Sequence, residues 1–525
     1  MRDLSSPTVR SAFRSSRSVW VRRVLAAGIV LAVGALYVGG AACHDELGYP
    51  LDDGWIHQTY ARSVARSGRF AYVGSEVSAG STSPLWTTML SLAYLLRLPP
   101  LLWSYLLGAV FWLLTGWAAA RLTSRLYPQG QALALWVGAA CLLEWHLAWA
   151  SFSGMETTLF TFLSLLLMER YAARARPAVV GLLGGLLFLA RPEGAGLVLL
   201  VTATFVAETL WPDRQQGSPR WGLLGRGLAS MAAGVALLLV PYVALNWVAS
   251  GQLLPNTFYA KQAEYGALLA QPLLARLWRV ARRPLIGGQV LLLPGFLWAA
   301  LSCVRIRRPG PGEGVAARSA LVRLLPLAWW AAYLATYALR MPADYQYGRY
   351  VMPTIPLLLL YGVVGTARWL RLRSARMLDR VLSRAAVAAI ACLFVAFLAI
   401  GQQAYASDVR LINCEMVRVA HWLEAETAPD ALVAAHDIGA IGYFGGRPLI
   451  DLAGLITPEV IPLMRDEQRL AEFIVDAGAD YLVTFPSWYP WITEQAEFVR
   501  VYQTDCALTR QKGGDNMAVY AIGQE

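Results

Sequence analysis

Apolar runs of about 20 residues recur along this chain from near residue 20 to about residue 404, and they decide what it can fold into. An α-helix needs about 20 apolar residues to cross the hydrocarbon core of a bilayer. Apolar residues make up 57% of the 525 residues and charged residues only 15%, which is more apolar surface than a water-soluble core buries. We therefore predict a polytopic α-helical membrane protein whose transmembrane domain spans residues 1–404.

The last part of the chain has a different composition. Residues 405–525 hold 8 Lys and Arg against 18 Asp and Glu, a net charge of −10, whereas residues 1–404 carry +21. Short segments in this tail have the character of strands, and one has that of a helix. The strands are expected at 432–435, 449–452, 481–485, 498–503 and 517–522, and the helix at 469–477. About 120 residues suffice for a compact domain, so we expect a small C-terminal α/β domain.

The arginines indicate how the chain lies in the membrane. Six of them precede the first apolar run, and most others gather in short loops between runs, as is typical of cytoplasmic loops. The loop arginines are Arg121, Arg125, Arg170, Arg174, Arg176, Arg214, Arg220, Arg226, Arg305, Arg307, Arg308, Arg371, Arg373, Arg376, Arg380 and Arg384. We expect a cytoplasmic N-terminus, about eleven transmembrane helices and an extracytoplasmic tail. Because membrane orientation accounts for the basic charge, nucleic acid is not expected as a partner.

Two segments need separate interpretation. The first external loop, 42–100, contains a short apolar piece at 84–96, which we interpret as a helix lying at the membrane interface because it is too short to cross. A group of four arginines comes out on the external side. Either an amphipathic helix on the outer surface holds them, or the topology is wrong by one crossing nearby. These residues are Arg276, Arg279, Arg282 and Arg283.

The six cysteines show no CxxC pair and no spacing typical of metal ligands. Four of them lie in or beside apolar runs, where cysteine acts as a small hydrophobe. Cys414 and Cys506 both fall in the tail. They form a disulfide if the tail lies in an oxidising compartment and brings them together, and the sequence leaves that separation open.

Two adjacent carboxylates, Asp52 and Asp53, begin an apparent helix just past the first crossing. One interpretation is capping of that helix and solvation of a surface loop. The other is chemistry: a carboxylate there removes a proton from an acceptor hydroxyl, or holds a divalent cation near phosphate. A like-charged neighbour raises the pKa of one member of such a pair, which favours unequal roles without saying which residue takes which.

Polar residues at other external positions are candidates for substrate binding. Small hydroxyl residues beside an aromatic suit contact with carbohydrate or phosphate, although the same residues also start ordinary helices and turns. The candidates outside the tail are Glu76, Ser83, Trp86, Glu156, Asn256 and Tyr259.

Three external cations, Arg191, Lys261 and Arg349, run against the orientation bias of the other basic residues. We predict that they bind the phosphate of the donor and neutralise it as it departs. The alternative is that they only reach the lipid headgroups. Two nearby carboxylates are expected to form ion pairs, Glu193 with Arg191 and Asp344 with Arg340.

In the tail, His436 and Asp437 begin a compact polar group at strand ends, which continues to Arg447 and Asp451. A neighbouring His and Asp are typical of catalytic or metal sites. However, no Ser or Cys nucleophile and no third metal ligand accompany them in the sequence. Structural turn chemistry is therefore the first interpretation, and binding of the acceptor is the second.

Seven stretches of the sequence, taken in order, resemble a known group of enzymes. They are LDDGWIHQTYARSVARSGRFAY (51–72), GSEVSAGSTSPLW (74–86), SGMETTLF (153–160), ARPEGAGL (190–197), PNTFYAK (255–261), YGRYVMP (347–353) and HDIGAIGYFGGRPLIDLAGL (436–455). The first two look like the first external loop of GT-C superfamily glycosyltransferases. These polytopic enzymes are related to protein mannosyltransferases, the aminoarabinose transferase of lipid A and mycobacterial arabinofuranosyltransferases. Each stretch alone is weakly specific, but their order on one membrane face is specific, and together they span nearly the whole chain.

The resemblance implies an activity. GT-C enzymes use polyprenyl-phosphate sugars, invert the anomeric centre and place an acidic residue of the first external loop near the acceptor, which points to Asp52 or Asp53 as the base. The branch with these motifs often has an alanine after the paired aspartates, where this chain has Gly54 and Trp55, so the sugar stays open. Phosphate-binding cations vary between branches, so the roles of the three external cations rest on topology.

The expected function is inverting transfer of a hexose or pentose from a polyprenyl-phosphate carrier to an acceptor hydroxyl on the extracytoplasmic face of the cell membrane. The acceptor is a glycan, a lipid or a protein of the cell envelope, and a metal requirement stays open. A non-catalytic lipid or sugar transporter is the main alternative, and a membrane-anchored binding protein is another. A transporter is expected to carry ionisable residues near helix midpoints, whereas the charges here cluster at helix ends.

Overall fold

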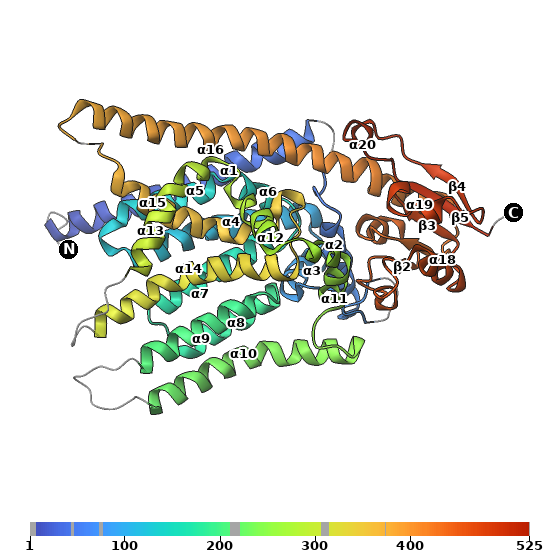
Figure 1. Cartoon of the computed structure of the whole chain (residues 1–525), viewed down its shortest axis with the longest axis horizontal. Helices are drawn as coiled ribbons and strands as arrows, with labels where there is room; N and C mark the ends of the chain where they lie inside the picture. The colour runs from blue at the N-terminus through green and yellow to red at the C-terminus, as the bar shows by residue number, and fades with distance from the viewer. Residues whose placement is uncertain are drawn as a thin grey trace, which may run out of the picture.

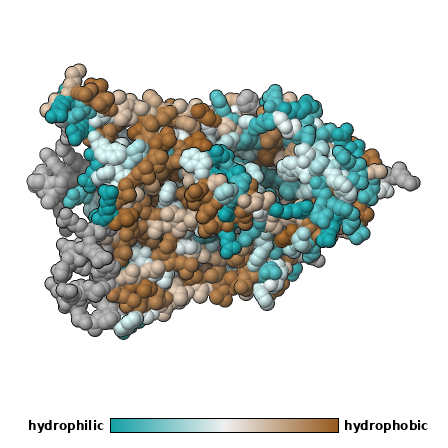
Figure 2. All heavy atoms as spheres, viewed as in Figure 1, coloured by the Kyte–Doolittle hydropathy of each residue, from teal (hydrophilic) through white to brown (hydrophobic). Residues whose placement is uncertain are grey.

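The structure is a computed structural model, and it describes residues 7–43, 47–72, 77–210, 221–305, 314–372 and 374–523. Long helices run side by side along the longest axis of the molecule (Figure 1). The N-terminus lies at one end of these helices, and the C-terminal sheet domain lies at the other. An apolar zone covers the helices between a hydrophilic sheet domain and smaller hydrophilic patches at the opposite end (Figure 2). The chain is a multi-pass membrane protein.

Several helices have the length and composition of membrane spans. Five segments of the described ranges are long and apolar enough to cross. They are Val21–Ala42 of α1 (Pro7–Ala42), α4 (Pro100–Leu126), α10 (Trp221–Ser250), Gln346–Trp369 with α15 (Ile355–Trp369), and Met377–Glu426 with α16 (Met377–Ile412). Two bent pairs bring the number to seven, and α8 (Pro177–Ala190) and α9 (Gly194–Leu210) are shorter apolar helices. The number of eleven crossings therefore stays a prediction.

The bent pairs are broken spans or re-entrant loops. The first pair consists of Pro128–Leu142, which contains α5 (Gln131–Leu142), and α6 (Trp145–Ser151). Their axes are bent by 56°. The second pair consists of Leu273–Leu285, which contains α12 (Leu273–Ala281), and Gly288–Val304, which contains α13 (Leu293–Val304). Their axes are bent by 104°. The remaining long helices are α7 (Thr157–Ala172) and α14 (Gly314–Arg340).

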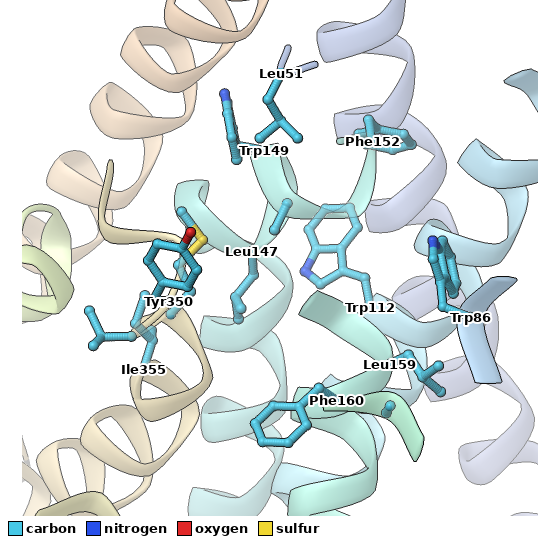
Figure 3. Close-up of a cluster of buried hydrophobic side chains, with 14 of the residues drawn as sticks. Leu51, Trp86, Trp112, Leu147, Trp149, Phe152, Leu159, Phe160, Tyr350 and Ile355 are labelled. Carbon is cyan, nitrogen blue, oxygen red and sulfur yellow. The ribbon is translucent and has the colours of Figure 1, made fainter. Parts of the chain in front are cut away.

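The core of the bundle is rich in large aromatic side chains that come from several helices (Figure 3). Trp112 of α4 is fully buried, and its indole nitrogen donates to the carbonyl oxygen of Cys141 at 3.0 Å. Trp149 of α6 and Phe160 of α7 are also buried. Because the one polar atom of Trp112 has a partner, its large apolar surface is buried without leaving an unpaired donor.

Short helices cover the end of the bundle that faces the sheet domain. They are α2 (Asp53–Ser67), α3 (Pro84–Leu95) and α11 (Asn256–Glu264), and Figure 1 shows them between the long helices and the sheet. The 12 residues of α3 are too few to cross a bilayer. This length agrees with the prediction of a short helix at 84–96.

The four arginines that fitted the topology poorly lie on and after α12. Arg279, Arg282 and Arg283 form ion pairs with Asp344 at 3.4, 3.0 and 2.6 Å. The predicted pair of Asp344 with Arg340 is wrong, because the chain turns after α14 and carries Asp344 to α12 instead. Leu274 and Trp278 of α12 are exposed apolar residues, as expected of an amphipathic surface helix.

The tail folds around a five-stranded sheet with the strand order β2-β1-β3-β5-β4. Its strands are β1 (Val433–Ala435), β2 (Leu449–Asp451), β3 (Tyr481–Thr484), β4 (Phe498–Gln503) and β5 (Ala518–Ile522). β1 pairs in parallel with β2 and β3, whereas β5 is antiparallel to β3 and β4. The five predicted strands and the predicted helix, α18 (Glu467–Asp476), are confirmed within a few residues. Residue 405, the predicted start of the tail, lies inside α16.

Cys414 and Cys506 form a disulfide with a Cα–Cα distance of 5.8 Å. The bond joins the π-helical turn Asn413–Val417, which follows α16, to the segment after β4. The neighbouring Glu415 is fully buried and accepts hydrogen bonds from the side chain of Asn516 at 2.7 Å and from the backbone of Met517 at 2.9 Å. Both contacts fasten the sheet domain to the last long helix.

Replacing Cys414 and Cys506 with alanine is expected to destabilise the sheet domain by about 2–5 kcal/mol, because the bond closes a long loop in the unfolded chain. Pulse proteolysis of the full-length protein in detergent measures this loss. Cys392→Ala is the matched control, since Cys392 is an exposed free cysteine. Free thiols at 414 and 506 in protein that has never been reduced would contradict the pairing.

Candidate active site

An open cavity lies where α2, α11 and the ends of α7, α8 and α14 meet. Its empty volume is about 1140 Å³ when the open solvent at its mouth is included. Its charged and titratable lining is dense for a site beside membrane-spanning helices. These lining residues are Asp53, His57, Glu156, Arg191, Glu193, Lys261, Arg340 and Arg349. Tyr337 and Tyr350 add aromatic walls, and Leu455 comes from the sheet domain.

Asp53 lies in the first turn of α2 and faces the cavity. Its carboxylate forms an ion pair with the guanidinium of Arg349, which also donates to the hydroxyl of Tyr350 at 2.9 Å. Burial acts to raise the pKa of Asp53, but the charges of Arg349 and Lys261 outweigh it and lower the pKa to about 2. Asp53 is therefore an ionised proton acceptor at neutral pH.

An unusual backbone segment holds Arg349 in place. The three preceding residues, Gln346, Tyr347 and Gly348, all have left-handed conformations, with φ of 47°, 60° and 73°. Residues other than glycine adopt this region at a cost, and such strain concentrates at functional sites. A methyl group on Gly348 would lie 2.6 Å from Cβ of Arg283, so the turn also packs closely against the arginines that surround Asp344.

The other two predicted phosphate-binding cations line the same cavity. The ammonium of Lys261 lies 2.9 Å from Oε2 of Glu264. Arg191, at the end of α8, pairs with Glu193 at 3.2 Å, as predicted, and donates to the hydroxyl of Tyr337 at 2.9 Å. All three cations thus line one cavity, although they come from three separate parts of the chain. The sequence predicted only that they lie on the same side of the membrane.

Asp52 has different surroundings from Asp53. It makes no capping bond to α2. Its two carboxylate oxygens accept the backbone N–H groups of Gly439 at 2.6 Å and of Ala440 at 2.8 Å. A methyl group on Gly439 would lie 2.1 Å from the carbonyl oxygen of Asp52, so glycine is required there. Asp52 therefore connects the first external loop to the sheet domain.

Burial, reinforced by the charge of Asp53, raises the pKa of Asp52 to about 7. The folded protein then binds a proton at Asp52 between about pH 4 and 7, where the unfolded chain has lost it. The free energy of unfolding should therefore decrease as the pH rises through this window, by at most about 1.4 kcal/mol per pH unit. Thermal unfolding at several pH values measures the slope. Asp52→Asn should make the slope shallower, and Asp451, whose pKa burial raises to about 6, should keep part of it. An unchanged slope in that variant would contradict the assignment.

The remaining predicted substrate-binding residues differ in position. Glu156 lines the cavity, whereas Glu76 lies outside the described residues. Ser83 and Trp86 are buried, and the indole of Trp86 donates to the carbonyl oxygen of Gly154 at 2.8 Å. This contact positions the chain before Glu156.

Four further predicted residues do not line the cavity in the part of the chain that the structure describes. Asn256 starts α11, and its backbone donates to the carbonyl of Ala79 at 2.9 Å. Tyr259 lies on the same helix. Nδ1 of His436 lies 2.7 Å from the hydroxyl of Tyr489. Burial raises the pKa of Asp437 well above its usual value, and the charges of Asp52 and Asp53 add to the effect.

Three acidic or basic lining residues were not predicted as site residues: His57, Glu193 and Arg340. Glu193 was expected only as the partner of Arg191. His57 lies four residues after Asp53 on α2, and this spacing puts both on one helix face. That spacing was the available signal. Arg340 lines the cavity at the end of α14, although the sequence paired it with Asp344.

Metal binding has one geometric candidate in the described ranges. Cys414, Glu415 and Cys506 have ligand atoms within 4.8 Å of one another, but the two cysteines are joined in the disulfide, so this group does not fit a metal ion. A divalent cation near Asp53 stays a prediction, and transfer assays with and without EDTA test it.

Residues 399–520 match a protein family described as a domain of unknown function, DUF8728. The sequence matches no curated protein. Among solved structures, ArnT from Cupriavidus metallidurans bound to undecaprenyl phosphate has a TM-score of 0.56 at 14% identity, over 96% of this chain and 98% of ArnT.

Two other solved structures share the fold. The oligosaccharyltransferase of Archaeoglobus fulgidus has a TM-score of 0.57 at 11% identity, over 89% of this chain and 69% of that protein. The arabinofuranosyltransferase AftD from Mycobacteria has a TM-score of 0.51 at 15% identity, over 96% of this chain and 40% of AftD. The chain therefore has the fold of the GT-C glycosyltransferases, which confirms the resemblance seen in its motifs.

Proposed function

We propose that this protein transfers a sugar from a polyprenyl-phosphate carrier to an acceptor hydroxyl. One observation carries the proposal: the partly buried, ionised carboxylate of Asp53 and the three predicted cations line a single cavity beside the membrane-spanning helices. The similar ArnT structure holds undecaprenyl phosphate, and the similar archaeal enzyme AglB is described with dolichol phosphate and an inhibitory peptide. A lipid phosphate suits the three cations, since charge-assisted hydrogen bonds to phosphate are strong.

We propose that the cavity faces the extracytoplasmic side. Its lining helices α2 and α11 lie at the sheet-domain end of the long helices, and the arginine-rich N-terminal segment begins at the opposite end (Figure 1). Cytoplasmic segments carry the excess of arginine in membrane proteins. The disulfide between Cys414 and Cys506 supports the same orientation, because disulfides persist in oxidising compartments.

The proposed reaction is a single displacement that inverts the anomeric centre. The acceptor oxygen bonds to the anomeric carbon, its proton passes to the carboxylate of Asp53, and the bond from the anomeric carbon to the phosphate oxygen breaks. Polyprenyl phosphate leaves with the bonding electrons. Arg349, Lys261 and Arg191 stabilise the negative charge that develops on it.

Arg349 couples donor binding to the strength of the base. Before the donor binds, its guanidinium is paired with Asp53 and holds the pKa of that carboxyl low. A phosphate that binds Arg349 competes for this pair and offsets its positive charge. The pKa of Asp53 then rises toward its ordinary value, so the carboxylate becomes a better proton acceptor when the donor is in place.

Deletion of the gene, followed by mass spectrometry of envelope glycans, glycolipids and glycoproteins, tests the proposal. The loss of one sugar from one acceptor class is the expected result, and it identifies both substrates. Complementation with the wild type should restore the sugar, and complementation with Asp53→Asn should not. An unchanged envelope composition in the deletion strain would contradict the proposal.

A further inference from the structure

One wall of the cavity pairs a histidine with a glutamate that the reaction above does not use. His57 of α2 and Glu156, just before α7, are each 4% exposed and line the cavity. Nε2 of His57 lies 3.2 Å from Oε2 of Glu156. His57 is one helical turn after Asp53, so the pair lies beside the proposed base.

Both side chains have polar atoms without hydrogen-bond partners in the described part of the chain. Nδ1 of His57 and Oε2 of Glu156 are fully buried, and the contact between the two residues lacks the geometry of a hydrogen bond. Nε of Arg349, across the same cavity, is also buried and unpaired among the described residues. Leaving such groups unsatisfied costs about 1–3 kcal/mol each, and a ligand in the cavity that bonds to them removes this cost.

The charge around the pair restricts the kind of ligand group that fits. Nε of Arg191 lies 3.7 Å from Oε1 of Glu156 and compensates its charge. Arg349, Lys261 and Arg340 add positive charge to the lining, and Asp53 and Glu193 add negative charge, so it holds four basic side chains against three carboxylates. An ammonium group is therefore disfavoured, whereas a neutral hydroxyl can donate to Oε2 of Glu156 and form a hydrogen bond with Nδ1 of His57.

We propose that His57 and Glu156 recognise ring hydroxyls of a neutral sugar on the lipid donor. The inference rests on the proposed function and adds the class of sugar: a hexose or pentose with free neighbouring hydroxyls and no free amino group. Arg349 and its neighbouring cations hold the phosphate, and the pair holds the sugar between the phosphate and Asp53. Binding therefore has a phosphate part and a sugar part, carried by different residues.

Binding measurements on the purified full-length protein separate these two parts. The probes are undecaprenyl phosphate and a panel of undecaprenyl-phosphoryl neutral hexoses and pentoses. We expect the wild type to bind at least one sugar-bearing lipid about 10- to 100-fold more tightly than undecaprenyl phosphate, the range of one or two hydrogen bonds to charged groups. Glu156→Gln and His57→Asn should lose this gain. His57→Asn should keep the affinity for undecaprenyl phosphate within about twofold. Glu156→Gln should bind undecaprenyl phosphate at least as tightly as the wild type, because Arg191 loses the carboxylate that compensates its charge.

The retained affinity for undecaprenyl phosphate also shows that each variant is folded. A deoxy form of the preferred sugar that lacks the contacted hydroxyl should show the same gain over undecaprenyl phosphate in the wild type and in Glu156→Gln. Retention of the full gain in both variants would overturn the inference. So would a wild type that binds undecaprenyl phosphate and gains nothing from any sugar, a result that leaves the proposed function intact. If the wild type binds no lipid of the panel, the proposed function fails and the inference fails with it.

Discussion

Asp53→Asn is expected to lower kcat for sugar transfer by about 10²–10⁴-fold, the usual contribution of a general base. Asparagine keeps the size of the side chain but is not basic enough to accept the proton of the acceptor hydroxyl. Asp53 faces the cavity and is held ionised, so this substitution removes the proposed proton acceptor. Single-turnover transfer from the donor that the deletion strain identifies measures the effect.

Asp52→Asn is the matched control, because it is the same substitution one residue earlier. Asp52 accepts backbone N–H groups of the sheet domain and does not line the cavity. We expect this variant to lose stability and less than about tenfold in kcat, since a displaced neighbour costs less than a lost base. Full activity of Asp53→Asn, or of the double variant, would remove the assignment of the base.

Arg349→Gln is expected to lower kcat by about 10²–10³-fold, as the loss of one preorganised charge-stabilising group does, and to weaken the binding of undecaprenyl phosphate. Arg349→Lys should recover part of the loss, because a lysine supplies the charge without the two-pronged geometry of arginine. The pKa of Asp53 should rise in Arg349→Gln, because Arg349 lowers it in the wild type. The acid limb of kcat/KM should then move to higher pH.

Arg469→Gln is the control for this substitution. Arg469 lies on the sheet domain, where its side chain is 70% exposed and pairs with Asp466. It does not line the cavity. Its loss should leave both kcat and donor affinity unchanged. If Arg349→Gln binds undecaprenyl phosphate as tightly as the wild type, Arg349 does not hold the donor phosphate.

The membrane class, the strands of the tail and the short helix α3 were predictable from sequence because each depends on local composition and period. The cavity was partly predictable for a related reason. Arg191, Lys261 and Arg349 were predicted from their side of the membrane, and residues at the same end of neighbouring helices have little room to lie far apart. The structure brings these three cations, Asp53 and Glu156 into one lining.

The division of roles between Asp52 and Asp53 was not predictable. It depends on where Gly439 and Ala440 pack, and these residues are almost 400 positions further along the chain. The disulfide is hidden for the same reason, since 92 positions separate Cys414 from Cys506. Composition gives no measure of how a distant domain docks, and only the tertiary contacts decide it.

Release of undecaprenyl phosphate is the measurement that tests the proposed chemistry most directly. Purified protein in proteoliposomes is given undecaprenyl-phosphate-linked sugar, with the envelope fraction of the deletion strain as acceptor. The wild type should release undecaprenyl phosphate in equal amount to the sugar gained by the acceptor, and Asp53→Asn and Arg349→Gln should release almost none. Equal release by the wild type and both variants, or sugar transfer without release of undecaprenyl phosphate, would contradict the proposed site.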